Sequence, residues 1–497
     1  MKSRRFSPLQ LSVAAAATAG LWLAVLARQR RKGPVHNTDQ WSRTARMASL
    51  GAKTGLSFAG LQARKVFADS ARRRDLDMAF EMKTAENVAE TLGQMKGALM
   101  KLGQMASYLD QGLPEHVRSA LSGLQHNAPP MSGELAAQVI AAELGETPEK
   151  LFAEWDPVPI SSASIGQVHR AITKDGRAIA VKVQYPGVAE AVSADLANAG
   201  FIFAGIGALF PGLDHKTLVN ELRDRVSEEL NYEIEARNQR AFANYYREHP
   251  TIHIPEVIDE YSTARVLCTE LVTGARWDEV LQWDQDEKDL VGETLYRFAF
   301  GSLYRLAAFN GDPHPGNYIF HDNGRVTFLD FGLVKYFTKE ELDTFGEMIH
   351  HMVIDHDPAK FRASVERIGL LPPGLDVTDD DVVDYLGHFY EFVAEDGPFT
   401  ITGEYASETI RRFFDTSGPY ASMQKAANLP PSFIIIQRIS LGLTAILGEL
   451  QATADWRSIA EELWPFVDGP PSTPMAKEIE VWRRRRHGEV KGAMLSA

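Results

Sequence analysis

The sequence lacks features that would place it in several common classes of protein. Its 497 residues contain one cysteine, Cys268, which excludes a disulfide framework and a thiolate metal site. Basic residues are outnumbered, 52 against 66 acidic ones, and the net charge is −14. Residues 1–33 hold seven Lys or Arg and no acid, so the remaining chain carries −21. Such an acidic body argues against a nucleic-acid partner.

Long apolar runs are also scarce. Residues 11–27 are mostly Ala, Leu and Val, and as a helix they would span about 26 Å, just short of a bilayer core. We favour a single membrane anchor here over a cleaved targeting sequence or a surface or packed helix. Basic residues flank both ends, so the orientation stays open. The apolar stretch 433–450 includes polar and charged residues, which favours a core helix.

The most specific pattern lies in the middle of the chain. Asp312 precedes Asn317 by five positions, and Asp330, which begins Asp-Phe-Gly, follows thirteen positions later. Phosphoryl transfer needs a carboxylate near the attacking group, and a second carboxylate with an amide oxygen to hold Mg²⁺; protein kinases supply them in this spacing. The alternative is a pair of unrelated loop aspartates.

Residues 161–168 align with the glycine-rich phosphate loop of kinases, Gly-x-Gly-x-x-Gly-x-Val. Only Gly166 and Val168 are kept, and the first two glycines are Ser161 and Ala163. Ser and Ala stiffen the turn and narrow the approach of backbone N–H groups to a phosphate. The loop residues expected at a nucleotide are Ser162, Ala163, Ser164, Gly166 and Val168.

A strand-like run at 178–183 places Lys182 where a kinase lysine contacts the α- and β-phosphates. The alternative is an exposed strand lysine. A helix expected over 216–243 carries Glu228, Glu229, Glu233 and Glu235 as candidate partners of Lys182, and periodicity does not choose among these four. Residues 265–274 read as a buried strand and turn, the position of a kinase hinge, where Glu270 and Val272 would meet the adenine.

The segment after Gly332 is short. A helix is expected over 339–354, no Ala-Pro-Glu follows, and there is no room for a long peptide-docking segment. A helix expected from residue 84 has Gly93, Gly97, Lys101 and Gln104 on its polar face. We expect it to lie between two surfaces and to project Lys101 and Gln104 into a confined site. The alternative is an ordinary amphipathic helix.

Over about residues 84–460 the chain resembles the UbiB/AarF-type atypical kinase family. The motifs that carry the resemblance are Lys101-Leu-Gly-Gln104, Ala163-Ser-Ile-Gly-Gln-Val-His169, Lys182-Val-Gln-Tyr-Pro-Gly187, Asp312-Pro-His-Pro-Gly-Asn317 and Asp330-Phe-Gly332. The resemblance implies an α+β, protein-kinase-like bilobal fold with an added N-terminal helical extension and a mostly helical C-lobe.

The resemblance also implies roles for single residues. Lys182 would contact ATP phosphates with Glu235 as its partner, and Asp312 would be the catalytic aspartate. Asn317 and Asp330 would bind Mg²⁺, while Lys101 and Gln104 would enter the site from the added helix. Where the family commonly has Glu-x-Asp, this chain has Glu229-Leu230-Asn231, so a carboxylate that could pair with Lys101 becomes an amide.

The domain division expected from these patterns has six parts. They are an anchor or targeting segment (1–33), a helical linker (34–83), an N-terminal extension (84–156), a kinase-like N-lobe (157–274), a helical C-lobe (275–467) and a flexible tail (468–497). The body is expected in an ATP-containing compartment, with membrane association through the first part.

By resemblance, the expected function is that of a Mg-ATP-dependent kinase or ATPase that acts in, or supports, the synthesis of isoprenoid quinones or other membrane lipids. Expected partners are ATP, lipid or quinone precursors and other biosynthetic enzymes. Two alternatives stay open. One is a protein kinase, and the other is a non-catalytic nucleotide-binding scaffold for membrane enzymes.

Overall fold

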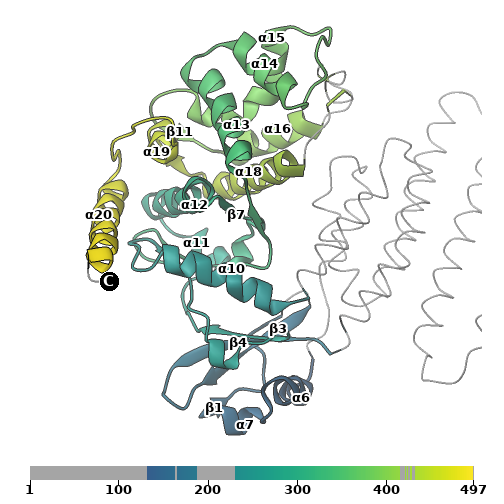
Figure 1. The fold of residues 1–497 in the computed structure, drawn as a ribbon, viewed down its shortest axis with the longest axis vertical. Coiled ribbons are helices and arrows are strands. Elements are labelled where there is room, and N and C mark those ends of the chain that lie inside the picture. The colour runs from purple at the N-terminus through teal and green to yellow at the C-terminus, as the bar shows by residue number, and fades with distance from the viewer. Residues whose placement is uncertain are drawn as a thin grey trace, which may run out of the picture. The chain divides into compact units, whose positions relative to one another are not determined.

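The computed structural model describes residues 131–162, 165–186, 188, 230–414, 420, 423, 426–427 and 431–495, and all of them belong to one compact unit. The expected anchor, the linker and the helix bearing Lys101 and Gln104 lie outside the described residues. What is described combines small, mainly antiparallel sheets with many helices (Figure 1), in agreement with the α+β expectation.

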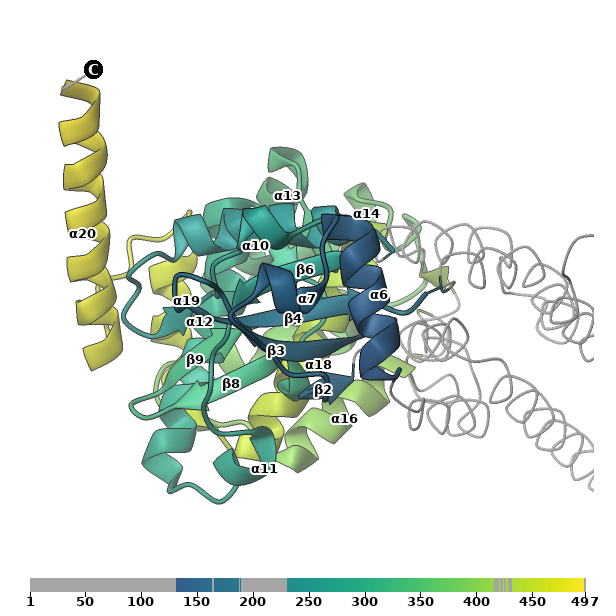
Figure 2. The same ribbon diagram turned by 90° about the horizontal axis from the view of Figure 1, so that it is seen from below.

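The first part of the described chain is a five-stranded antiparallel sheet with two helices (Figure 2). Its elements are α6 (Gly133–Leu144), α7 (Pro148–Leu151), β1 (Glu154–Trp155), β2 (Ser161–Ser162), β3 (Gly166–Ile172), β4 (Ala178–Gln184) and β6 (Val266–Glu270). The strand order is β1-β3-β4-β6, with β2 also pairing with β3. Because β1 belongs to this sheet, the sheet begins before the expected lobe boundary at residue 157.

Strand alternation fixes the direction of Lys182. Ile179, Val181 and Val183 of β4 are fully buried and pack with α6 in one apolar cluster. Successive side chains of a strand point to opposite faces of the sheet. Lys182 therefore lies on the face opposite α6.

The prediction of one continuous helix over 216–243 is wrong between Leu230 and Tyr232. The chain turns at Leu230, and α10 (Tyr232–Tyr245) begins two residues later. Asn231 is the N-cap, with extended backbone (φ −122°, ψ 98°), and its side-chain oxygen accepts the Glu233 N–H at 3.0 Å. Asn serves this position as well as Asp does, so the departure from the family pattern keeps the helix start.

The second part of the described chain is mainly helical. Its first elements are β5 (Ile252–His253), η2 (Asp259–Tyr261), α11 (Trp277–Val280), α12 (Gln285–Leu306), β7 (Ala308–Asn310), η3 (Pro315–Asn317), β8 (Tyr318–His321), β9 (Arg325–Phe328) and β10 (Val334–Tyr336). Then follow α13 (Lys339–Ile349), η4 (His350–Ile354), α14 (Pro358–Arg367), α15 (Asp379–Leu386), η5 (Gly387–Val393), β11 (Phe399–Thr400), α16 (Gly403–Phe414), α18 (Pro431–Leu450), β12 (Thr453–Ala454), α19 (Trp456–Leu463) and α20 (Pro474–Leu495).

The helix expected over 339–354 is present as α13 and one π-helical turn, η4. Thr338 and Glu341 form a capping box at its start. The stretch 433–450 lies in α18, and its buried Leu443, Ile446 and Leu447 belong to the main core. Within the described ranges, no helix has both the length and the apolar character to cross a membrane.

The expectation of a flexible tail over 468–497 is wrong. Residues 474–495 form α20, and its first turns are buried through Met475, Ala476 and Ile479. The indole of Trp482 donates to the Arg247 carbonyl at 2.9 Å and packs on His249. The prolines before the helix and its arginine run suggested a solvated tail, but an apolar stripe between the charges attaches it to the body.

A buried ion triplet joins α12, α19 and the start of α20. Arg297 is 3% exposed. Its guanidinium lies 2.7 Å from Glu293 and 2.8 Å from Glu462. Thr473, just before α20, donates to the same Glu293 carboxylate at 2.6 Å. This cluster links helices that are distant in sequence.

Arg297→Met should therefore lower the free energy of unfolding by about 3–5 kcal/mol, because it leaves two buried carboxylates without their cation. Urea denaturation followed by circular dichroism measures this loss. The matched control is Arg484→Met, whose pair with Glu480 is largely exposed, and it should leave the midpoint almost unchanged. Equal midpoints for the two variants would contradict a structural role for the triplet.

Candidate active site

Lys182 is held between two carboxylates on the inner face of the first sheet. Its Nζ lies 2.7 and 2.8 Å from the two oxygens of Glu235 on α10, and 3.7 Å from Asp330. Burial lowers the pKa of Lys182, but the charges of Asp330 and Glu235 outweigh it and raise the pKa above its usual value. The lysine is therefore a fixed cation that contacts two carboxylates from different elements.

Helix α10 positions this cluster through two further residues that the sequence patterns did not indicate. The ring of Tyr232 lies 5.0 Å from Lys182 Nζ, at cation–π distance. One helical turn after Glu235, Asn238 is buried and donates to the Phe331 carbonyl at 3.0 Å. One face of α10 thus contacts both the lysine strand and the Asp330-Phe331-Gly332 segment.

The loops bearing Asp312 and Asp330 are tied together by their flanking strands. Strand β7 precedes residues 311–317 and pairs with β10, which follows Asp330-Phe331-Gly332. Strand β8 follows the first loop and pairs with β9, which precedes the second. The strands that flank one loop therefore pair with the strands that flank the other, which fixes the relative position of the two loops.

Asn310 bridges the two loops. Its side-chain amide donates to the Asp330 carbonyl at 2.7 Å, and its amide oxygen accepts the Asp312 N–H at 3.3 Å. The residue is 8% exposed. It satisfies backbone groups of both aspartates with a neutral side chain. Its only sequence signal was its place at the end of a short apolar strand, two residues before Asp312.

Asp312 and Asn317 contact each other directly. The side-chain amide nitrogen of Asn317 donates to the Asp312 carboxylate at 3.1 Å. The main-chain carbonyl of Asn317 accepts the Leu329 N–H at 2.9 Å. Because the amide nitrogen is used in this way, Asn317 Oδ1 is the atom left for a cation. Burial and the charge of Asp312 raise the pKa of the neighbouring Tyr318, which stays a neutral phenol.

Asp330 and Asn317 carry the types of oxygen atom that a divalent cation prefers as ligands. Asp330 Oδ1 accepts the Gly332 N–H at 2.9 Å, which fixes the carboxylate. In the part of the chain that the structure describes, no group of three His, Cys, Asp or Glu side chains could hold a metal ion. Oxygen ligands from one carboxylate and one amide suit Mg²⁺, which in proteins usually completes its shell with substrate phosphates and water.

The loop residues expected at a nucleotide are only partly described. Ser161 pairs with Val168 and Ser162 with Gln167 across β2 and β3, whereas Ala163 and Ser164 lie outside the described residues. Gly166 has a packing reason to be glycine, since a Cβ there would lie 2.4 Å from the Val183 carbonyl. This close approach of backbones explains the glycine without a ligand.

At the expected hinge, β6 is a buried strand as predicted, and Cys268 is fully buried. Burial raises the pKa of the Cys268 thiol, so it is a core group and no nucleophile. The Glu270 N–H donates to the Glu256 carbonyl at 2.9 Å, and the Glu270 carboxylate lies 3.3 Å from His253. That N–H is therefore unavailable to a base. Val272 follows the strand and is half-buried.

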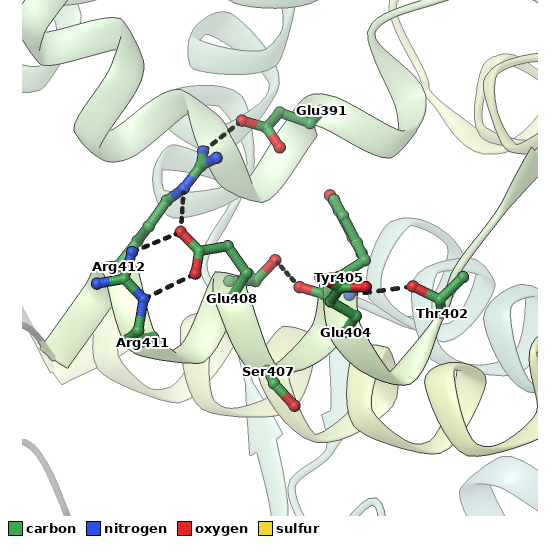
Figure 3. Close-up of a pocket in the computed structure, with 9 residues that line it drawn as sticks. Glu391, Thr402, Glu404, Tyr405, Ser407, Glu408, Arg411 and Arg412 are labelled. Atoms are coloured by element: carbon green, nitrogen blue, oxygen red, sulfur yellow. Dashed lines mark hydrogen bonds and ion pairs between the residues drawn. The ribbon is translucent and has the colours of Figure 1, made fainter.

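A hollow of about 510 Å³ lies along α16 and is lined by none of these residues (Figure 3). Four of its charged groups, Glu391, Glu408, Arg411 and Arg412, form ion pairs with one another. Glu408 accepts from Arg411 and Arg412, which lowers the pKa of Glu408 to about 2, and Arg412 also reaches Glu391 at 2.8 Å. This hollow therefore contains none of the residues expected to transfer a phosphoryl group. The cluster around Lys182 is the better candidate for the active site.

Comparison with known proteins identifies relatives of this chain. Residues 123–364 match the ABC1 atypical kinase-like domain. A mitochondrial atypical kinase, coq-8 of Caenorhabditis elegans, is 28% identical over 76% of this chain and 50% of its own length. An uncharacterized chloroplastic aarF domain-containing protein kinase of Arabidopsis thaliana is 30% identical over 83% of this chain and 57% of its own. The chain thus spans little more than half the length of these relatives.

A solved structure described as the complex of Rv3197 with erythromycin, from Mycobacterium tuberculosis, has a TM-score of 0.59 and 30% sequence identity. The match covers 80% of this chain and 100% of that one. It supports a kinase-like domain of mixed helices and strands for the described body. The chain belongs to the ABC1/AarF, or UbiB-type, family of atypical kinases.

Proposed function

We propose that the chain is a Mg-ATP-dependent phosphotransferase or ATPase. The observation that carries the proposal is the position of Lys182, with its Nζ 2.7 Å from Glu235 and 3.7 Å from Asp330. An ammonium fixed between a helix glutamate and a metal-binding aspartate is the arrangement that phosphoryl transfer in kinases requires. Lys182 would contact the nucleotide phosphates, and Glu235 would keep it in place.

In this proposal, Asn317 and Asp330 hold Mg²⁺, and Asp312 orients the attacking hydroxyl or water. The metal supplies positive charge that neutralises the phosphates. Asp312 is well placed for its role because the Asn317 amide and the Asn310 bridge fix the loop on both sides of it. Ser162, Ala163, Ser164, Lys101 and Gln104 remain proposed contacts of the nucleotide or its surroundings.

For the acceptor, we propose water or a small or lipid-linked molecule. Only six residues separate Gly332 from the start of α13, and three of them form β10, which pairs with β7. This leaves no platform for a peptide. The link to isoprenoid quinone or other membrane lipid synthesis, to partner enzymes and to a membrane rests on the family resemblance. Phosphorylation of a generic peptide substrate would favour the protein-kinase alternative.

Asp330→Asn tests the proposal. The variant keeps an oxygen that can accept the Gly332 N–H, but it removes the anionic ligand, so Mg-ATP hydrolysis should fall by about 100-fold or more. Phosphate release by the purified full chain, with and without lipid vesicles, measures this effect. The control is Asp322→Asn, the same change at an exposed position before β9, which should hydrolyse like the wild type. Equal turnover in Asp330→Asn and wild type would refute the metal assignment.

A second test uses the packing of the loop that carries Asp312, residues 311–317, on α18; we call it the catalytic loop. A Cβ on Gly442 would lie 2.8 Å from Pro313, the residue after Asp312. Because the proline ring is stiff, Gly442→Ala should displace the loop and slow hydrolysis by about tenfold.

The matched control is Gly301→Ala in α12, where the nearest atom would lie 3.6 Å away. Both changes favour a helix, so both proteins should remain folded in a thermal melt. If Gly442→Ala hydrolyses ATP as fast as Gly301→Ala, α18 does not position the loop.

A further inference from the structure

Helix α18 carries a polar stripe that points into the protein. Gln437, Ser440 and Thr444 are spaced three and four residues apart, so they lie on one face of the helix. All three line a hollow bounded by α12, α13, η5 and α18. Gln437 is 3% exposed. A core helix would ordinarily turn apolar residues to this side.

The Gln437 amide is unsatisfied. Neither its Oε1 nor its Nε2 has a hydrogen-bond partner among the described residues. Ser and Thr hydroxyls in a helix can donate to the carbonyl one turn earlier, so Ser440 and Thr444 need no outside partner. A buried amide with both atoms unpaired is costly and needs an explanation, such as a bound molecule.

The walls of the hollow define what could bind there. Of the eighteen residues that line it, nine are aromatic, among them Tyr304, Tyr390 and Phe433, and none is Asp, Glu, Lys, Arg or His. The space amounts to about 800 Å³ when the part open to solvent is counted, and about 60 Å³ of it admits a water-sized group. It therefore suits a slim, uncharged, apolar molecule and excludes a phosphate or an ammonium group.

We propose that this hollow binds an uncharged apolar alcohol whose hydroxyl group pairs with Gln437. A hydroxyl can accept a hydrogen bond from Nε2 and donate one to Oε1, whereas an ether or ketone oxygen can only accept. The aromatic walls would cover the apolar body of the ligand. This site is separate from the candidate active site. None of its lining residues is one of the five proposed active-site residues, Lys182, Glu235, Asp312, Asn317 and Asp330.

The competing explanation is water. A space of 60 Å³ is large enough for a few water molecules, and they could satisfy the amide. Water would give no selectivity between apolar ligands. The two explanations differ in whether the protein distinguishes a hydroxyl group from an ether oxygen.

The test uses two isomers of the same size, 1-hexanol and 1-methoxypentane. Saturation-transfer NMR on the full chain should show saturable binding of 1-hexanol, at least fivefold tighter than binding of the ether. In Gln437→Met, which is similar in volume and apolar, the preference should fall below twofold. The same change at the exposed Gln282 should leave it intact.

A thermal melt of Gln437→Met should match or exceed that of the wild type, because removing an unpaired buried amide is neutral or stabilising. Absence of saturable 1-hexanol binding to the wild type, equal affinity for the two isomers, or a preference that survives in Gln437→Met would each overturn the proposal. The wild-type comparison decides the question even if the variant does not fold.

Discussion

The ion pair between Lys182 and Glu235 is the contact on which the site depends. It joins the first sheet to α10, at 2.7 Å and largely out of water. A buried pair is stable only while both charges are present, since either one alone would face the full cost of desolvation. The pair therefore fixes α10 against β4, and through Asn238 it also fixes the Phe331 backbone. Asp330 lies 3.7 Å from the same ammonium, so Lys182 also links the sheet to the segment that begins at Asp330.

The loops that carry Asp312 and Asp330 are held in place by neutral amide side chains and by strand pairing. Asn310 satisfies backbone groups of both aspartates, and the strand pairs β7–β10 and β8–β9 hold the four ends of the two loops. The Asn317 amide nitrogen donates to Asp312, which leaves Asn317 Oδ1 as the amide atom for the proposed metal ion. Fixed loops are what a preorganised phosphate site needs, because little reorganisation remains when charge develops.

Sequence patterns predicted the strands around Lys182 and Cys268, the α18 core helix and the short connection to α13, because apolar periodicity marks each of them. Glu235 could be chosen among four glutamates only through the family resemblance. The break before α10 was missed because Leu230 and Ile234 continue the apolar spacing across it, and only the Asn231 cap marks the boundary. Asn310 and Asn238 were missed because a single buried amide leaves no periodic signal. Helix α20 was not predicted because its run of arginines suggested a solvated tail.

Helix α18 connects two parts of the protein that share no residues. Gln437 faces the aromatic hollow, and Gly442, five residues on, lies against Pro313 of the catalytic loop. Along the helix axis the two positions are separated by about 7.5 Å. A helix is stiff over that length, so a shift of α18 at the hollow must be transmitted to the loop or absorbed by strain between Gly442 and the proline ring. The helix backbone at Gly442 packs so closely on Pro313 that a Cβ would not fit between them. The loop that carries Asp312 would therefore move with the helix.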